Sequence, residues 1–169
     1  MKLWDRILNF FGWAIGEAEM VGLVYPVKPY VACVEPGVLF RGSRPDSLST
    51  PMPEINLVVS FTAERQIDDN LYRIFPNAAF INIPILDNTC PTDTDVKLFL
   101  AYIENRVEGL SGHPPIFCHC EAGIGRTGCM IAAYRVKINH WTPKRALEEA
   151  KSYGLKMPCQ IEWIKNLKE

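Results

Sequence analysis

The chain of 169 residues is long enough for one domain with a hydrophobic core, since 48% of its residues are hydrophobic and 22% are charged. Its formal net charge of −1 at pH 7 gives no overall attraction for nucleic acid or for acidic membranes, so neither is expected as a general partner. The six cysteines are irregularly spaced in a chain that needs no disulfides for stability. This usage favours free thiols and a cytoplasmic, intracellular location.

The first 25 residues have a pattern of their own. Apolar side chains recur at helical spacing over residues 3–15, so residues 1–25 are predicted to form an amphipathic helical extension of a domain that spans 26–169. Polar residues interrupt this stretch too often for a membrane span or for the apolar core of a secretion signal. Two interpretations stay open: the helix packs on the domain, or residues 3–15 make a weak contact with a membrane or a partner protein.

Short apolar runs bounded by turn residues predict the strands of the domain. An edge strand is expected within 22–36, and further strands are expected within 37–45, 55–61 and 80–85. Arg41, near the end of the second of these strands, is expected to be a structural ion-pair partner rather than a catalyst.

Helical patterns alternate with these strands. A short helix is expected over 64–74, where the charges of Glu64, Arg65, Asp68 and Asp69 are interpreted as a solvated face. Longer helices are expected over 93–109, over 142–153 behind a Thr142 cap, and from 157 onward. The alternation predicts an α/β fold: a central, mostly parallel, twisted sheet of about four to five strands flanked by helices on both faces.

One ten-residue stretch, His119 to Gly128, carries most of the chemistry. The apolar run 116–119 predicts a buried strand, and the apolar residues after Gly128 predict a buried helix that starts near Gly125 or Arg126. A glycine-containing loop between them turns its amide hydrogens inward and forms a nest for an anion at the helix N-terminus. The residues of this predicted phosphate nest are Glu121, Ala122, Gly123, Ile124, Gly125 and Arg126.

Two side chains of the nest suggest a reaction. The guanidinium of Arg126 can hold two oxygens of a phosphate group. Cys120 lies in the same positive field, which favours the nucleophilic thiolate over the thiol. No metal or other cofactor is required, and the adjacent Cys118, His119 and Cys120 match no common metal-ligand spacing.

The run from His119 through Thr127, with five residues between Cys120 and Arg126, resembles the signature of the cysteine-dependent protein tyrosine phosphatases. The length of the chain and the run 37–45 are closer to the small atypical dual-specificity phosphatases. The resemblance implies phosphomonoester hydrolysis through a phosphocysteine intermediate formed on Cys120. It also implies that Thr127 hydrogen-bonds the sulfur and that His119 bonds the backbone of the loop.

Asp87 is the candidate general acid. It follows the strand within 80–85 by two residues, which puts it at the same sheet edge as Cys120. A carboxylic acid there could protonate the departing oxygen, and the surrounding segment resembles the general-acid loop of dual-specificity phosphatases. Asp93 is the rival, although Thr92 or Asp93 is better explained as a helix N-cap. Gln160 resembles the glutamine that positions hydrolytic water in related phosphatases, and an exposed first-turn residue is the alternative.

The acidic Glu121 in the nest should repel a highly phosphorylated ligand. A phosphorylated protein or peptide is therefore the expected substrate, with phosphotyrosine first and phosphoserine or phosphothreonine also considered. The alternatives are a phosphoinositide or another small phosphate ester, or a phosphate-binding module with little turnover.

Overall fold

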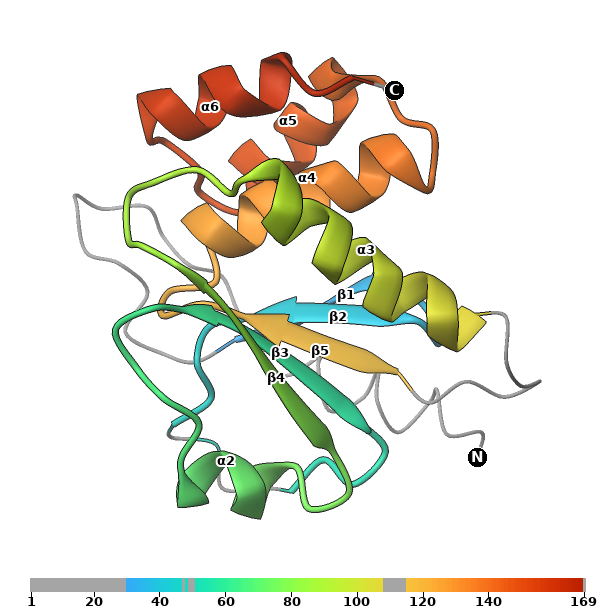
Figure 1. Ribbon diagram of the computed structural model, residues 1–169, viewed down its shortest axis with the longest axis vertical. Helices are drawn as coiled ribbons and strands as arrows, with labels where there is room; N and C mark the ends of the chain where they lie inside the picture. The colour runs from blue at the N-terminus through green and yellow to red at the C-terminus, as the bar shows by residue number, and fades with distance from the viewer. Residues whose placement is uncertain (1–29, 47, 49–50, 108–114, 169) are drawn as a thin grey trace.

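The computed structural model describes residues 30–168 apart from 47, 49–50 and 108–114 (Figure 1). The predicted helical extension over 1–25 lies outside the described residues, and its boundary with the domain stays a prediction. Within the part of the chain that is described, no helix is both long and apolar enough to cross a membrane.

Five strands form one sheet in the order β1-β2-β5-β3-β4. The edge strand β1 runs antiparallel to β2, and all other neighbours are parallel, which confirms the mostly parallel sheet. The strands are β1 Val31–Glu35, β2 Leu39–Gly42, β3 Leu57–Thr62, β4 Ala79–Ile85 and β5 Ile116–His119.

Helices cover both faces of the sheet, as the alternation of elements predicts. Figure 1 shows α2 on one face and the other four helices on the opposite face. Their bounds are α2 Asp69–Ile74, α3 Asp93–Val107, α4 Gly125–Lys137, α5 Pro143–Ser152 and α6 Pro158–Lys165.

The central strand β5 contributes alternate side chains to two hydrophobic cores. Ile116 and Cys118 belong to the larger core, which includes residues of α3 and α4. Phe117 belongs to the core under α2, and His119 stacks on it with ring centroids 5.7 Å apart. All four residues are buried, and Cys120 continues the face of Cys118. His119 and Cys120 therefore lie toward opposite faces of the sheet.

Side-chain caps set the starts of three helices. Thr142 Oγ1 accepts a hydrogen bond from Arg145 N (3.4 Å), which confirms the predicted cap of α5. Thr92 Oγ1 accepts from Asp95 N (3.2 Å), while Asp95 Oδ2 accepts from Thr92 N (2.8 Å). Thr92 is thus the cap of α3, and Asp93 lies in its first turn.

The helix expected over 64–74 is shorter than predicted. It begins at Asp69, because Asp68 caps it by accepting a hydrogen bond from Leu71 N (3.2 Å). Glu64, Arg65 and Asp68 are partly solvated as expected, with side-chain exposures of 43%, 40% and 45%, but they precede the helix and form no helix face. All three are held in ion pairs that reach other segments of the chain.

Candidate active site

The predicted strand, loop and helix follow one another as expected. Strand β5 ends at His119, the loop runs from Cys120 to Ile124, and α4 begins at Gly125. The loop thus lies at the carboxyl edge of the parallel strands, where ligands of such sheets bind. The nucleophile candidate Cys120 is 2% exposed, and Arg126 in the first turn of α4 is equally buried.

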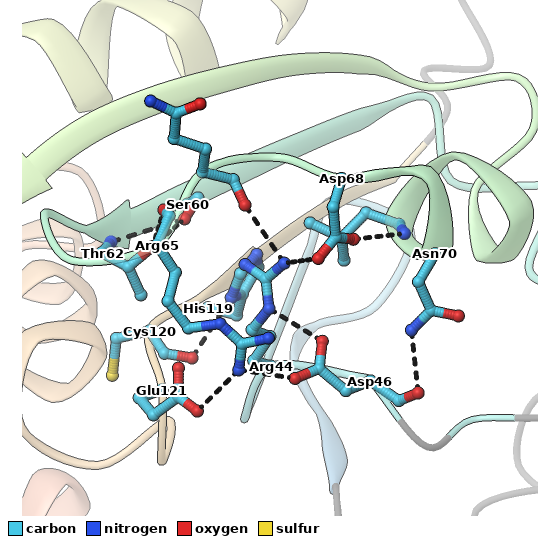
Figure 2. Close-up of polar contacts among 12 residues, drawn as sticks. Arg44, Asp46, Ser60, Thr62, Arg65, Asp68, Asn70, His119, Cys120 and Glu121 are labelled. Atoms are coloured by element: carbon cyan, nitrogen blue, oxygen red, sulfur yellow. Dashed lines mark hydrogen bonds and ion pairs between the residues drawn. The ribbon is translucent and has the colours of Figure 1, made fainter.

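Two carbonyl groups at the start of the loop are bound from behind. His119 Nδ1 donates to the carbonyl oxygen of Cys120 (3.2 Å), a contact that Figure 2 shows, and Arg44 N donates to that of Glu121 (3.0 Å). Burial lowers the pKa of His119 to about 4, so the ring is neutral at pH 7 and Nδ1 carries its proton. His119 bonds the loop backbone as predicted.

The carbonyl of Gly123 is held by two donors. Tyr30 donates its hydroxyl (2.7 Å) and Arg41 donates Nη2 (2.6 Å) to this oxygen. Gly123 has φ +72°, and a Cβ there would lie 2.4 Å from the backbone oxygen of Gly42. Among the described residues Arg41 has no carboxylate partner for the expected ion pair: its guanidinium binds this carbonyl and lies 4.0 Å from the ring centroid of Tyr153.

A trans peptide bond directs its carbonyl and its N–H to opposite sides. Each carbonyl of the loop that is held by a donor therefore leaves the N–H group of the following residue turned away from that donor. Three loop carbonyls are fixed in this way, and the anion-binding nest stays a prediction.

Arg126 is held in place by carboxylates. Glu64 accepts from Nη1 (2.6 Å) and from Nη2 (2.7 Å), and the carbonyl of Ile85 accepts from Nη1 (3.1 Å). These hydrogen bonds lower the pKa of Glu64 to about 2. Nε of Arg126 is buried and has no partner among the described atoms, so one donor of the guanidinium stays available.

Glu64 is a site residue that sequence reasoning missed. It follows the end of β3 by two residues, just as Asp87 follows the end of β4. That shared position at the carboxyl edge of parallel strands was the signal that could have identified it.

The predicted general acid reaches the same guanidinium. Asp87 Oδ1 lies 3.2 Å from Arg126 Nη2, and the Asp87 side chain is 64% exposed. The rival Asp93 lies in the first turn of α3. The geometry therefore favours Asp87 over Asp93 as the carboxylic acid next to a bound anion.

Gln160 also approaches the loop. It is 2% exposed, its Nε2 donates to the carbonyl of Thr89 (2.8 Å), and a Cβ built on Gly125 would lie 2.8 Å from its Oε1. The alternative of an exposed first-turn residue is wrong. Gln160 connects the Asp87 loop to the start of α4, and its action on water stays a prediction.

Thr127 Oγ1 is buried and has no hydrogen-bond partner among the described atoms. The predicted bond to the Cys120 sulfur is therefore not made in this structure. Thr127 lies in the first turn of α4, directly after Arg126, so its hydroxyl is an uncommitted donor close in sequence to the loop.

An ion-pair network borders the loop on the side of α2 (Figure 2). Arg65 pairs with Glu121 (3.1 Å) and with Asp46 (2.7 Å). The buried Arg44 pairs with Asp46 (2.8 Å) and with Asp68 (2.6 Å). The network ties the first nest residue to the segment ahead of α2 and leaves an excess of carboxylates on this rim.

Two curated relatives are phosphatases by name. The chain is 33% identical over 102 residues to the putative tyrosine phosphatase 067L of Invertebrate iridescent virus 3, which covers 59% of this chain and 42% of the relative. It is 30% identical over 108 residues to the dual specificity protein phosphatase OPG106 of Vaccinia virus (strain Western Reserve), or 60% of this chain and 56% of the relative. The chain thus spans about half the length of the curated relatives it matches.

Solved structures share the fold. TpbA of P. aeruginosa superposes with a TM-score of 0.64 at 22% identity, covering 85% of this chain and 92% of that one. The catalytic domain of the PP-IP phosphatase SIW14 from S. cerevisiae has a TM-score of 0.64 at 16% identity, covering 84% and 88%.

A family model matches nearly all of the described chain. The model of the PTP-SAK family, described as "Swiss Army Knife protein, DSP-PTPase phosphatase domain", matches residues 28–168. The chain belongs to this family of DSP-PTPase phosphatase domains.

Proposed function

We propose that the protein hydrolyses phosphomonoesters on proteins or peptides, phosphotyrosine first and phosphoserine or phosphothreonine after it, through a phosphocysteine intermediate on Cys120. The observation that carries the proposal is the 3.2 Å approach of Asp87 to Arg126 at a loop whose carbonyls are bound from behind. In this arrangement the candidate acid Asp87, the candidate phosphate-binding cation Arg126 and the candidate nucleophile Cys120 lie at one edge of the sheet. A reducing compartment such as the cytoplasm keeps Cys120 free for this reaction.

In the first step the Cys120 thiolate attacks phosphorus in line with the departing oxygen. A sulfur–phosphorus bond forms while the phosphorus–oxygen bond to the substrate breaks. The loop N–H groups and Arg126 stabilise the equatorial oxygens, where negative charge accumulates. Protonated Asp87 gives its proton to the leaving oxygen, which departs as an alcohol or phenol.

In the second step water attacks the phosphocysteine. Asp87, now a carboxylate, takes a proton from that water, the phosphorus–sulfur bond breaks, and phosphate leaves the regenerated thiolate. The contact of Gln160 with Thr89 and its position against Gly125 support a role in placing the water.

The charges around the loop favour a substrate with a single phosphate. Glu64, Asp87 and Glu121 lie at or next to the site, and Arg126 is already matched by Glu64. A polyphosphorylated headgroup would meet these carboxylates as repulsive neighbours. A small phosphate ester remains the alternative, because the same fold occurs in the PP-IP phosphatase SIW14.

The test compares wild type with Cys120→Ser in excess chelator. Wild type should release phosphate from a phosphotyrosine peptide with a burst of the dephosphorylated product, and the variant should release none. Cys118→Ser is the matched control, because Cys118 is buried two residues earlier and donates to the carbonyl of Phe40 (3.4 Å) instead. Turnover retained by Cys120→Ser would remove the mechanism. A clear preference for a polyphosphorylated inositol over the peptide would replace the substrate class.

A further inference from the structure

Arg41 is a buried cation that the proposed mechanism does not use. Its side chain is 0% exposed and its Nη2 donates to the carbonyl of Gly123 (2.6 Å). Nε and Nη1 are buried and have no partner among the described atoms. The guanidinium is thus fully desolvated, and its partners among the described residues are neutral: the carbonyl of Gly123, the hydroxyl of Tyr30 and the ring of Tyr153.

Three other arginines are buried in the described part of the chain, and each has a carboxylate partner. Arg44 pairs with Asp68 at 2.6 Å, Arg126 with Glu64 at 2.6 Å and Arg135 with Glu149 at 2.8 Å. Among the described residues Arg41 has none. Burial of an uncompensated charge costs several kcal/mol, so the fold keeps this cation in spite of a substantial penalty.

The register of the sheet places Arg41 close to the candidate nucleophile. Arg41 is the neighbour of Cys118 in the parallel pairing of β2 with β5. Neighbouring residues of paired strands point to the same face of a sheet, as do residues two apart on one strand. Arg41, Cys118 and Cys120 therefore share one face. The pKa of Cys118, raised to about 12 mainly by burial, is also lowered by Arg41 and raised by Cys120.

The guanidinium extends under the loop toward α4. A Cβ built on Gly128, in the first turn of α4, would lie 3.9 Å from Arg41 Nη2. By holding the carbonyl of Gly123, Arg41 directs the N–H of Ile124 to the opposite side of that peptide. The side chain can therefore act in two ways, through its charge and through this one peptide group.

The charge balance of the site suggests what the positive charge of Arg41 could compensate. Arg126 is already matched by Glu64 and contacts Asp87 as well. In the proposed reaction a thiolate and a phosphate dianion occupy the loop together, and the cation that is closest to them offers no surplus charge. A second cation without a carboxylate partner, behind the loop and out of water, would stabilise both anions.

We propose that Arg41 is a positioning residue that supplies the second cation of the oxyanion site, from behind the loop and without touching the substrate. The inference rests on the proposed function, since it names the group that compensates the anions of that reaction.

The experiment uses the full chain and two readouts that do not require turnover. The first is the Kd for tungstate, a tetrahedral dianion of phosphate shape, measured by titration calorimetry. The second is the rate at which iodoacetamide alkylates Cys120 at pH 6.5, followed by mass spectrometry of its peptide, because the thiolate is the reacting species. Turnover of an aryl phosphate is measured on the same samples.

Arg41→Met should weaken tungstate binding by about tenfold or more and slow alkylation of Cys120 by a similar factor. Arg41→Lys, which keeps the charge, should stay within about threefold of wild type in both readouts. Arg135→Met is the matched control, because it also removes a buried arginine but one that binds Glu149 and the carbonyl of Val34. This control should leave tungstate affinity unchanged. If Arg41→Met does not fold, Arg41→Gln takes its place.

Wild-type affinity in Arg41→Met would overturn the inference, as would an Arg41→Lys that is as weak as Arg41→Met or an equal loss in Arg135→Met. In each of these cases the proposed function is still supported if the wild-type protein binds tungstate and hydrolyses the aryl phosphate. A wild type that neither binds tungstate nor releases phosphate overturns the proposed function and this inference together. Tyr30→Phe removes a hydrogen bond to the same carbonyl but no charge, so it should lose less affinity than Arg41→Met.

Discussion

The Asp87 carboxylate occupies part of the guanidinium that a phosphate would use, since its Oδ1 lies 3.2 Å from Arg126 Nη2. A bound dianion would compete for that donor and repel the carboxylate. In the proposed reaction, substrate binding would thus act directly on Asp87, the proposed acid.

Asp87→Asn should lower turnover of phenyl phosphate by about 10²–10⁴-fold, because phenoxide is a poor leaving group without a proton donor. Turnover of p-nitrophenyl phosphate should fall less, since its leaving group needs little protonation. Steady-state rates give the ratio of turnover with p-nitrophenyl phosphate to turnover with phenyl phosphate. Asp93→Asn should leave this ratio unchanged. An equal loss with both esters in Asp87→Asn would contradict the assignment.

His119 should make the stability of the protein sensitive to pH. Burial lowers its folded-state pKa to about 4, below the unfolded value near 6.5, so the unfolded chain binds the extra proton. The associated stability is fully present above pH 6.5 and is lost as pH falls toward 4, by up to roughly 3 kcal/mol. Urea unfolding between pH 7 and pH 4 measures it.

His119→Gln should show a flatter pH dependence over that interval, although its stability at pH 7 should be lower. If wild type and variant give parallel curves, the neutral buried imidazole is not the source of the pH effect.

At the scale of elements, the join between β5 and α4 depends on one backbone conformation. Gly123→Ala should destabilise the protein by roughly 2 kcal/mol or more, because φ is +72° and the new Cβ would lie 2.4 Å from the Gly42 backbone. Tungstate affinity should fall with it, as the loop can no longer close on Gly42 and Ser43. Urea unfolding and calorimetry measure the two effects.

Gly128→Ala is the control for that change. Its Cβ would meet its nearest neighbour at 3.8 Å, an ordinary contact, and the residue lies within helix α4. Alanine there should preserve stability or raise it by up to about 1 kcal/mol. Equal destabilisation by both variants would contradict the strained geometry assigned to Gly123.

Local patterns predicted the elements that carry the motif but not every boundary. The apolar run of β5, the glycines of the loop and the Thr142 cap are signals within a few residues, and each is found as expected. The start of α2 was predicted too early, because the charged residues ahead of Asp69 fit a helical pattern. Their actual partners, Arg126 for Glu64 and Arg44 for Asp68, are distant in sequence.

For the molecule as a whole, an oxyanion that binds the folded state alone should raise thermal stability. At a tungstate concentration of 100 Kd the gain is about 2.7 kcal/mol, which for a chain of this length corresponds to about 5–11 °C in Tm. Arg126→Met should abolish the rise, and it should leave the Tm difference between pH 7 and pH 5 without ligand largely intact. A rise retained in Arg126→Met would locate tungstate elsewhere.

The fold class could be predicted from sequence because strand and helix patterns alternate along the whole chain. The positions of Cys120 and Arg126 between β5 and the first turn of α4 could be predicted because both lie in one short motif, and their chemistry stays a prediction. The supports of the site could not, since Arg41 and Gly123 are 82 residues apart and Arg126 and Glu64 are 62 apart. Those pairs arise when strand order brings β2 and β3 to either side of β5.

The hairpin of β1 and β2 at the edge of the sheet determines how distant substitutions would affect the candidate site. Tyr30 precedes β1, Arg41 belongs to β2 and Arg44 follows it. All three donate hydrogen bonds to carbonyl groups of the loop between β5 and α4. Residues at the edge of the sheet thus hold the backbone of the candidate site in place. We therefore expect substitutions in β1 and β2 to weaken oxyanion binding before they unfold the rest of the domain.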